Sequence, residues 1–79
     1  MKNVEYYAGL SYQEDVSLED CTDGTRCYLA RVVELPGCES HGDTPQEALR
    51  NLQEAKRLFI ATLLENGVRP AEPFSVQVR

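Results

Sequence analysis

Five acidic side chains stand close together in one polar stretch of this chain, and carboxylates grouped in this way can hold a metal ion or divide acid and base roles. The five are Glu14, Asp15, Glu19, Asp20 and Asp23. Their spacing lacks the alternating aspartates, the glycine and the final glutamate of a calcium-binding loop. The spacing therefore favours a solvated loop, whose acids could attract a basic partner.

Three cysteines and one histidine form a second group that could bind a metal. Zinc sites usually contain cysteine pairs separated by two to four residues, but Cys21 and Cys27 are six positions apart, and only Cys38 and His41 are closely spaced. The sequence therefore predicts no metal and no cofactor. It also predicts three free thiols, because no export signal precedes them, with Cys38 as a small buried apolar residue.

A nucleophile and base formed by Cys38, His41 and Asp43 is the third chemical candidate. Such an arrangement needs a base within hydrogen-bond reach and an oxyanion site. The sequence offers one histidine and no nucleophile elbow, so no catalytic residue and no enzyme is predicted. A minimal magnesium-dependent nuclease built on Glu5, Glu34 and Asp43 is kept as an alternative, because these carboxylates fall on different elements.

The clearest structural signal lies where a turn leads into a helix. Thr44 can cap the helix by accepting from the N–H of Glu47, and Glu47 can bond back to the N–H of Thr44. Pro45 falls at the first helical position, where its missing N–H is not needed. Gly37 and Gly42, on the preceding turn and short strand, are expected to supply positive φ.

The helix is expected to run from Pro45 to Asn66, with Gly67 in the left-handed position that follows a helix. Its narrow apolar stripe consists of Ala48, Leu52, Ala55, Phe59, Thr62 and Leu63. Leu58, Ile60 and Leu64 widen that stripe. They are expected to be either core beneath a last strand or an oligomer interface, since a core of this size is marginal.

The remaining elements are predicted to be strands. Alternation of apolar and polar residues predicts a strand over 4–12, followed by a polar loop over 14–25 that turns at Asp23-Gly24. A second strand over 27–35 and a short third over 38–42 precede the helix, and a last strand contains Phe74, Val76 and Val78. The order β-β-β-α-β predicts one α+β domain over residues 1–79. It is a two-layer domain with a mostly antiparallel sheet and one long helix on one face.

The formal net charge of −5 is unevenly placed, since residues 1–43 hold nine acids and three bases. Such a surface repels phosphate, so direct nucleic-acid binding is not expected, whereas a basic protein would be attracted. No apolar run approaches the roughly 18 residues of a bilayer span, and the first residues lack the apolar centre of a signal peptide. The sequence therefore predicts no membrane association and a cytoplasmic location.

One group of motifs is similar to that of a known family. In order, the chain carries Tyr28-x-Ala30, Leu35-Pro36-Gly37-Cys38, Gly42-Asp43-Thr44 and Glu47-Ala48. Together they resemble the motifs of the HicB-like antitoxin family. The resemblance implies a truncated RNase H-like fold without a nuclease site, in which these motif residues are structural.

The same resemblance implies a partner, which would be a small basic HicA-type toxin that cleaves mRNA. It also implies a homodimer or a higher homo-oligomer. Many family members carry a C-terminal DNA-binding segment, for which no room follows Arg79, so operator binding is not expected. The residues expected to contact the toxin are Glu14, Asp15, Glu19, Asp20 and Glu34. A homo-oligomeric structural or ligand-binding scaffold with no toxin partner is the alternative.

Overall fold

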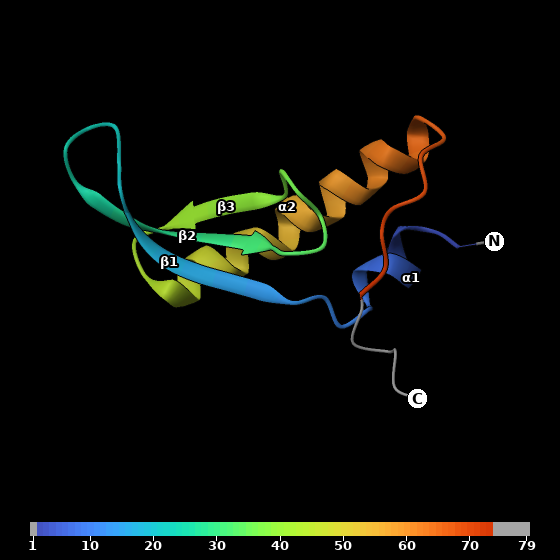
Figure 1. Cartoon of the computed structure of the whole chain (residues 1–79), viewed down its shortest axis with the longest axis horizontal. Coiled ribbons are helices and arrows are strands. Elements are labelled where there is room, and N and C mark those ends of the chain that lie inside the picture. The colour runs from blue at the N-terminus through green and yellow to red at the C-terminus, as the bar shows by residue number, and fades with distance from the viewer. Residues whose placement is uncertain (1, 74–79) are drawn as a thin grey trace.

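Residues 2–73 are described by a computed structural model, in which three strands are followed by a long helix (Figure 1). The elements are α1 (Val4–Ala8), β1 (Glu14–Asp20), β2 (Arg26–Val32), β3 (Glu39–Gly42) and α2 (Pro45–Glu65). The strands form one antiparallel sheet in the order β1-β2-β3, and α2 packs against one face of it. The expected α+β arrangement of an antiparallel sheet followed by one long helix is confirmed.

The strand predicted over 4–12 is wrong, because Val4–Ala8 form the short helix α1. The side chain of Asn3 caps this helix, and its Oδ1 accepts from the N–H of Tyr6 at 3.0 Å. Residues spaced by three and four lie on one helix face, and Tyr7 is the buried ring while Tyr6 is 39% exposed. The pattern of apolar residues was compatible with the spacing of a strand and with that of a helix, and the cap at Asn3 favours the helix.

The stretch predicted as a polar loop contains β1, which pairs along its whole length with β2. Val16 and Leu18 alternate here with polar residues, which is the period-2 pattern of a strand. The high density of charge concealed this pattern. The turn beyond β1 falls where it was expected, at Gly24, whose φ is +88°.

The second and third strands are shorter than predicted, because the chain already turns over residues 33–37. The φ of Gly37 is +94°, a conformation that favours glycine. The N–H of Cys38 donates to the carbonyl of Leu35 at 2.9 Å, and the carbonyl of Cys38 accepts from the N–H of Val32 at 3.0 Å. Cys38 is 2% exposed, as expected for a small buried residue.

The prediction of three free thiols is wrong, because Cys21 and Cys27 form a disulfide. Pairing of β1 with β2 brings these residues together at the base of the hairpin turn, with their Cα atoms 6.0 Å apart. Of the three cysteines, Cys38 keeps a free thiol. A separation of six residues in the sequence does not by itself predict a disulfide, but a tight hairpin makes the two side chains neighbours.

The start of α2 is confirmed at Pro45, where the hydroxyl of Thr44 accepts from the N–H of Glu47 at 3.0 Å. The carboxylate of Glu47 accepts from the N–H of Asp43 at 2.7 Å, and not from Thr44 as predicted. The capping box therefore closes one residue earlier.

None of the helices in residues 2–73 is both long and apolar enough to span a membrane.

The end of α2 follows the predicted left-handed turn. The helix ends at Glu65, Asn66 is its C-cap, and Gly67 has a φ of +74°. The N–H of Val68 donates to the carbonyl of Leu63 at 2.8 Å, and the N–H of Gly67 donates to that of Leu64 at 3.0 Å. These two bonds are those of a Schellman motif, which satisfies carbonyls that have no partner within the helix.

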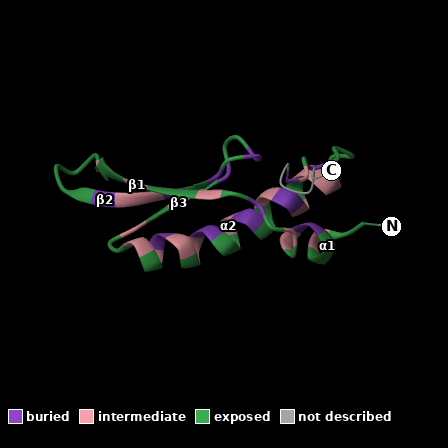
Figure 2. Cartoon of the chain, turned by 60° about the horizontal axis from the view of Figure 1, so that its bottom comes forward, coloured by how far each residue is buried: buried purple, intermediate pink, exposed green. Residues whose placement is uncertain are grey.

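The buried face of α2 is a row at four-residue spacing, and the buried residues face the sheet (Figure 2). The row consists of Ala48, Leu52, Lys56 and Ile60. It is rotated from the predicted stripe, because the lysine interrupts the apolar pattern in the sequence. Ile60 is 0% exposed and lies in the core, which is the first of the two alternatives stated for it.

Gly42 is needed for close packing and not for positive φ as predicted. Its φ is not among the positive ones. A Cβ atom at this position would lie 2.4 Å from the backbone N of Ala48 and 2.9 Å from its Cα. The backbone of β3 therefore rests directly on the first turn of α2.

Gly42→Ala is expected to lower the free energy of unfolding by about 1–3 kcal/mol, since backbone must move to admit the methyl group. Gly9→Ala is the matched control. A Cβ there meets only Glu5 O at 3.4 Å and Tyr6 O at 3.7 Å, so a change within about 0.5 kcal/mol is expected. Urea titration followed by circular dichroism measures both, and equal losses in the two variants would contradict the close-contact argument.

The chain after α2 turns back toward α1 and the start of β1 (Figure 1). The hydroxyl of Tyr12 donates to the carbonyl of Ala71 at 2.5 Å, and the Nζ of Lys2 donates to Glu72 at 3.0 Å. Pro70 and Pro73 are buried in this segment. The last strand predicted around Phe74, Val76 and Val78 lies outside the described residues.

Burial, followed by the negative charge of Glu72, raises the pKa of Tyr12 from 10.0 to about 12. The fold favours the protonated ring, so this contribution to stability is complete below pH 10 and disappears as the pH rises through about 12. Tyr12→Phe removes both the titration and the bond to Ala71. We expect it to be less stable than the parent chain at pH 7 by about 1 kcal/mol. The gap should close and then reverse as the pH rises from 10 toward 12, because only the parent chain loses stability there. Unfolding curves at several pH values measure the difference, and a constant gap would contradict the assignment.

Candidate partner-binding surface

Within residues 2–73, β1 forms one edge of the sheet, and the direction of its peptide groups follows from its pairing. The carbonyl of Gln13 accepts from the N–H of Val33 at 2.8 Å, so the odd-numbered residues bond to β2. In an antiparallel pair, successive residues direct their peptide groups to opposite sides. The N–H and C=O groups of residues 14, 16, 18 and 20 therefore point outward, away from β2.

The side chains of β1 lie on two faces of the sheet. Glu14 is on the face toward α2, because its carboxylate meets Lys56 of that helix. Val16 and Leu18 lie on the same face as Glu14, because residues two positions apart on a strand point to the same side. They are nevertheless 36% and 43% exposed, since α2 lies beneath β2 and β3 and barely touches β1. Asp15 and Glu19 lie on the opposite face, which the helix does not cover.

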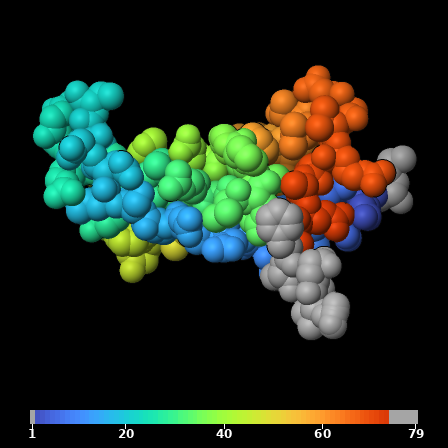
Figure 3. Space-filling view, viewed as in Figure 1, coloured from blue at the N-terminus to red at the C-terminus, as the bar shows by residue number. Residues whose placement is uncertain are grey.

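Residues 14–25 hold five acids and no base, so this segment alone carries as much charge as the whole chain. In the space-filling view its hairpin projects as a lobe at the end of the molecule away from α1 (Figure 3). Asp15, Glu19 and Asp20 are exposed there. The hydroxyl of Ser17 donates to Glu19 at 2.7 Å, and Arg26 pairs with Asp20 at 3.6 Å, but neither contact covers the acids.

Two of the acids expected to contact a partner make internal contacts. Glu34 is 8% exposed, and its Oε1 accepts from the N–H of Gln13 at 3.0 Å. The Oε2 of Glu14 accepts from the Nζ of Lys56 at 3.3 Å, and Gln53 donates to the same carboxylate. Both carboxylates therefore hold the start of β1 against its neighbours, and Glu34 has little surface left for a partner.

Lys56 is a functional group that the sequence reasoning missed. It is 5% exposed, and its Nζ lies 5.7 Å from the centre of the Tyr12 ring. A buried charge is unfavourable unless it is paired. Its partner Glu14 belongs to β1, so this ion pair is the main link between α2 and that strand.

The open face of the sheet carries a shallow hollow of about 460 Å³ around Arg31. Arg31 lies directly across from Asp15 on β1 and Glu39 on β3. Like the hairpin, this face is more acidic than basic, because Glu19 also belongs to it. A partner that approaches this side would meet carboxylates around a single guanidinium.

The surface of α2 offers a different candidate contact. Leu58 is 70% exposed, and it lines a hollow of about 360 Å³ together with Phe59 and Gly37. Leu64 is partly buried and packs against the core. Of the three residues expected either in the core or at an oligomer interface, Leu58 is therefore the one whose side chain is mostly exposed.

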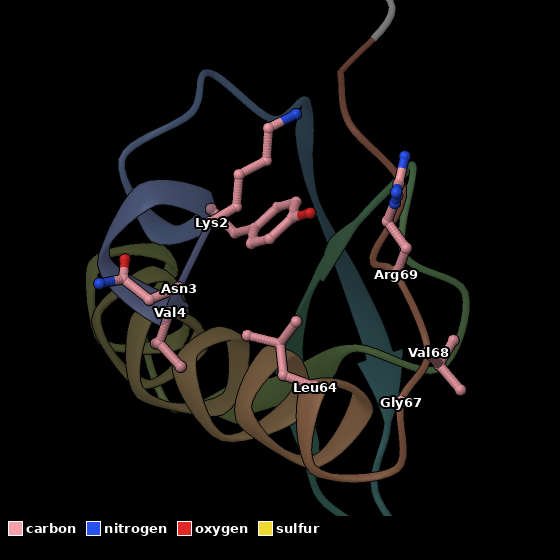
Figure 4. A pocket seen from close by; sticks show the side chains of 8 residues that line it. Lys2, Asn3, Val4, Leu64, Gly67, Val68 and Arg69 are labelled. Atoms are coloured by element: carbon pink, nitrogen blue, oxygen red, sulfur yellow. The ribbon is translucent and has the colours of Figure 1, made fainter.

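A further hollow of about 740 Å³ opens between α1 and the end of α2 (Figure 4). Val4, Tyr7 and Leu64 form its apolar wall, and Lys2 and Arg69 lie at its rim. Lys2 also pairs with Glu72, which raises the pKa of its amine. This hollow has the size of a small-ligand pocket, and it was not anticipated from the sequence.

Of the residues considered for metal binding or catalysis, Cys21, Cys27, His41 and Asp43 line one hollow of about 270 Å³, where the two cysteines are joined as a disulfide. Across residues 2–73, no three His, Cys, Asp or Glu side chains form a group that could hold a metal ion. Glu5 pairs with Arg57 of α2, which lowers the pKa of its carboxyl group. Burial raises the pKa of the Cys38 thiol, which makes it a poor nucleophile.

HicB-like antitoxins of bacterial toxin–antitoxin systems match this chain over residues 15–79, a span that runs from β1 through α2. The chain belongs to this family, whose members are typically non-catalytic. The motif residues named above lie on β2, in the turn that follows it, around β3 and at the capped start of α2.

Three relatives are similar to the chain over different lengths. A UPF0150 protein of Synechocystis sp. is 43% identical over 67 residues, which cover 84% of this chain and 82% of the relative. A UPF0150 protein of Thermoplasma acidophilum is 42% identical over 40 residues, or 51% of this chain and 58% of the relative. An uncharacterized protein of Haemophilus phage HP1 is 39% identical over 51 residues, or 65% of this chain and 36% of the relative. No solved structure matches the chain at a significant level.

Glu14→Gln is expected to lower the free energy of unfolding by about 1–3 kcal/mol, because it leaves the buried ammonium of Lys56 without a counter-charge. Lys56→Met is the matched control, since it removes the buried charge and keeps the length of the side chain. A change of less than about 1 kcal/mol is expected there. Chemical unfolding measures both values, and a larger loss in Lys56→Met than in Glu14→Gln would contradict this account.

Proposed function

We propose that this chain is an antitoxin that binds a small basic HicA-type toxin and masks its RNA-binding surface. Membership of the HicB-like antitoxin family supports a toxin as the partner. The observation that carries the proposal is the concentration of five acids and no base over residues 14–25, a segment whose strand β1 barely touches α2. This surface has the same sign of charge as the RNA phosphates that a ribonuclease binds.

The proposed mechanism is competition for one surface. A protein that binds RNA does so mainly through basic side chains that neutralise phosphates. An acidic partner meets the same side chains, and complementary charge speeds the encounter. Masking then needs no chemistry on the part of the antitoxin, only a long-lived complex.

The contact residues that we assign to this surface are Asp15, Glu19 and Asp20, which are exposed on β1. Glu14 and Glu34 are assigned a supporting role, because they fix the position of the strand through Lys56 and Gln13. The nuclease alternative loses support, because Glu5 pairs with Arg57 and Glu34 accepts from the N–H of Gln13.

A second candidate function is a homo-oligomeric scaffold without a toxin. The exposed side chain of Leu58 over its neighbouring hollow favours it, since exposed apolar side chains on a small domain are often covered by another copy. The two candidates use different surfaces of the molecule, so one chain could self-associate through α2 and bind a toxin through β1.

The double variant Asp15→Lys/Glu19→Lys is expected to slow association with a HicA-type toxin by about tenfold or more at low salt, because it reverses charge where the partner approaches. Glu54→Lys/Glu65→Lys is the matched control, with the same change in net charge at exposed positions of α2. Co-expression with the small basic protein encoded beside this chain identifies the toxin, and stopped-flow mixing measures the rate. A parent chain that binds no HicA-type toxin would contradict the proposed function, and equal slowing in both variants would contradict the assigned surface.

A further inference from the structure

We infer that the disulfide between Cys21 and Cys27 is a site of thiol exchange, at which reduction loosens the acidic hairpin and weakens its binding of a basic partner. The substrate class is a small thiol, which opens the disulfide in two steps. The effect on the partner rests on the proposed function, whereas the exchange itself can be measured on the chain alone.

The disulfide lies where a small thiol can reach it. Both cysteines line the hollow of about 270 Å³ beside β3 and the first turns of α2. Cys21 is half-buried, whereas Cys27 is 6% exposed, so attack is expected at the sulfur of Cys21, with Cys27 as the leaving group. Ala71 is bonded to Tyr12, which precedes β1, whereas Cys21 follows β1. The described chain therefore ends at the other end of this strand.

The exchange balances with two molecules of thiol. The thiolate of the first molecule attacks the sulfur of Cys21, the bond between the cysteines breaks, and the sulfur of Cys27 leaves with the electron pair and takes a proton. The thiolate of the second molecule attacks the added group of this mixed disulfide and releases Cys21 as a thiol. The chain gains two electrons and two protons, and the two small thiols become one small disulfide.

Charge around the hollow favours a cationic thiol over an anionic one. Asp43 and Glu47 line the hollow together with His41, and Glu19 stands directly across from Cys27 on β1. Each of these carboxylates repels an approaching anion. A thiolate that also carries an ammonium therefore meets less repulsion than one that carries a sulfonate.

The disulfide fastens the part of the hairpin that extends past β3 (Figure 1). β3 pairs with β2 only as far as Tyr28, which lies opposite Gly42. From there to the turn, the pairing that holds β2 within residues 2–73 is the one with β1. A two-stranded hairpin is only marginally stable in water. The bond between Cys21 and Cys27 therefore holds its two arms together where β3 no longer supports them.

Two of the three acids assigned to the partner stand beside these cysteines. Glu19 pairs with Cys27 across the ladder, and Asp20 directly precedes Cys21. Neither cysteine belongs to the hydrophobic cluster between the sheet and α2, so the rest of the domain is expected to stay folded on reduction. The freed arms can separate, and a partner that must then order the acids binds more weakly.

The proposed function also favours a bond that opens and closes over a permanent one. A chain that masks an RNA-binding toxin, as proposed, works in the compartment that holds the RNA. Disulfides are rare in reducing compartments, and those that occur there are usually transient and catalytic or redox-sensing.

The first test measures exchange on the full chain with cysteamine, which is cationic, and with mercaptoethanesulfonate, which is anionic. Free thiols are counted in denaturant after an acid quench, and each rate is divided by the rate of that thiol with an uncharged small disulfide. We expect the count to rise from one per chain to three, and cysteamine to react about threefold faster or more at low salt. Asp43→Asn should narrow this difference. A disulfide that millimolar thiol leaves intact would overturn the inference.

The second test locates the loosening by hydrogen exchange. The N–H groups of Glu19 and Cys27 bond across the ladder, because the odd-numbered residues of β1 bond to β2. We expect their exchange to quicken on reduction, while that of Ser17 and Leu29, the next bonded pair, stays unchanged. The circular dichroism spectrum should also stay unchanged. Its loss on reduction would overturn the inference, because the disulfide would then hold the whole fold.

The third test compares the affinity for the HicA-type toxin in the two redox states. We expect the oxidised chain to bind about tenfold more tightly than the reduced chain. Cys21→Ser/Cys27→Ser should bind like the reduced chain with or without reductant. Cys38→Ala is the matched control, because Cys38 is outside the disulfide, and this variant should keep the full response to reductant.

The outcomes separate the inference from the proposed function. Equal affinity of the oxidised and reduced chains would overturn the effect on the partner and leave the antitoxin function standing. A chain that binds no HicA-type toxin in either state, yet exchanges thiols and loosens at Glu19, would contradict the antitoxin function and support the exchange site. A response to reductant that persists in Cys21→Ser/Cys27→Ser would assign the response to another group and overturn the inference.

Discussion

The direct contact between the backbone of β3 and the first turn of α2 is the constraint on which the rest of the structure depends. Gly42 permits it, since any side chain there would meet the backbone of Ala48. With its first turn fixed at that edge strand, the helix runs beneath β3 and β2 and barely touches β1. Within residues 2–73, β1 is therefore the strand of the sheet that α2 covers least, and Val16 and Leu18 stay exposed on the face toward the helix.

The ion pair between Lys56 and Glu14 compensates for that geometry. The lysine occupies a position in the buried row of α2, where an apolar side chain would be usual, and its long stem reaches across to β1, which the helix barely touches elsewhere. The aliphatic part of the side chain can pack with the core while the ammonium meets the carboxylate and the ring of Tyr12. β1 is thus attached through a polar contact at one end, and the rest of the strand stays open.

The local features of this fold could be predicted from the sequence, and the features that depend on pairing could not. The capped start of α2 was predictable because Thr44, Pro45 and Glu47 act on one another within a single turn. β1 was missed because its charges suggested a loop, and only its pairing with β2 makes it a strand. The same pairing creates the disulfide of Cys21 with Cys27, and the burial of Lys56 depends on a carboxylate 42 positions away. At the candidate site, the acidic composition was evident, but which carboxylates remain exposed is a property of the assembled sheet.

The acids of β1 have two opposite effects on the chains that can approach this strand. An uncovered strand with apolar residues such as Val16 and Leu18 is a hazard, because identical chains can pair along it. The interleaved carboxylates oppose that pairing by repulsion between copies, and they attract a chain of the other sign. Charge is therefore a selective form of protection, because it disfavours a second copy along β1 and favours a basic chain.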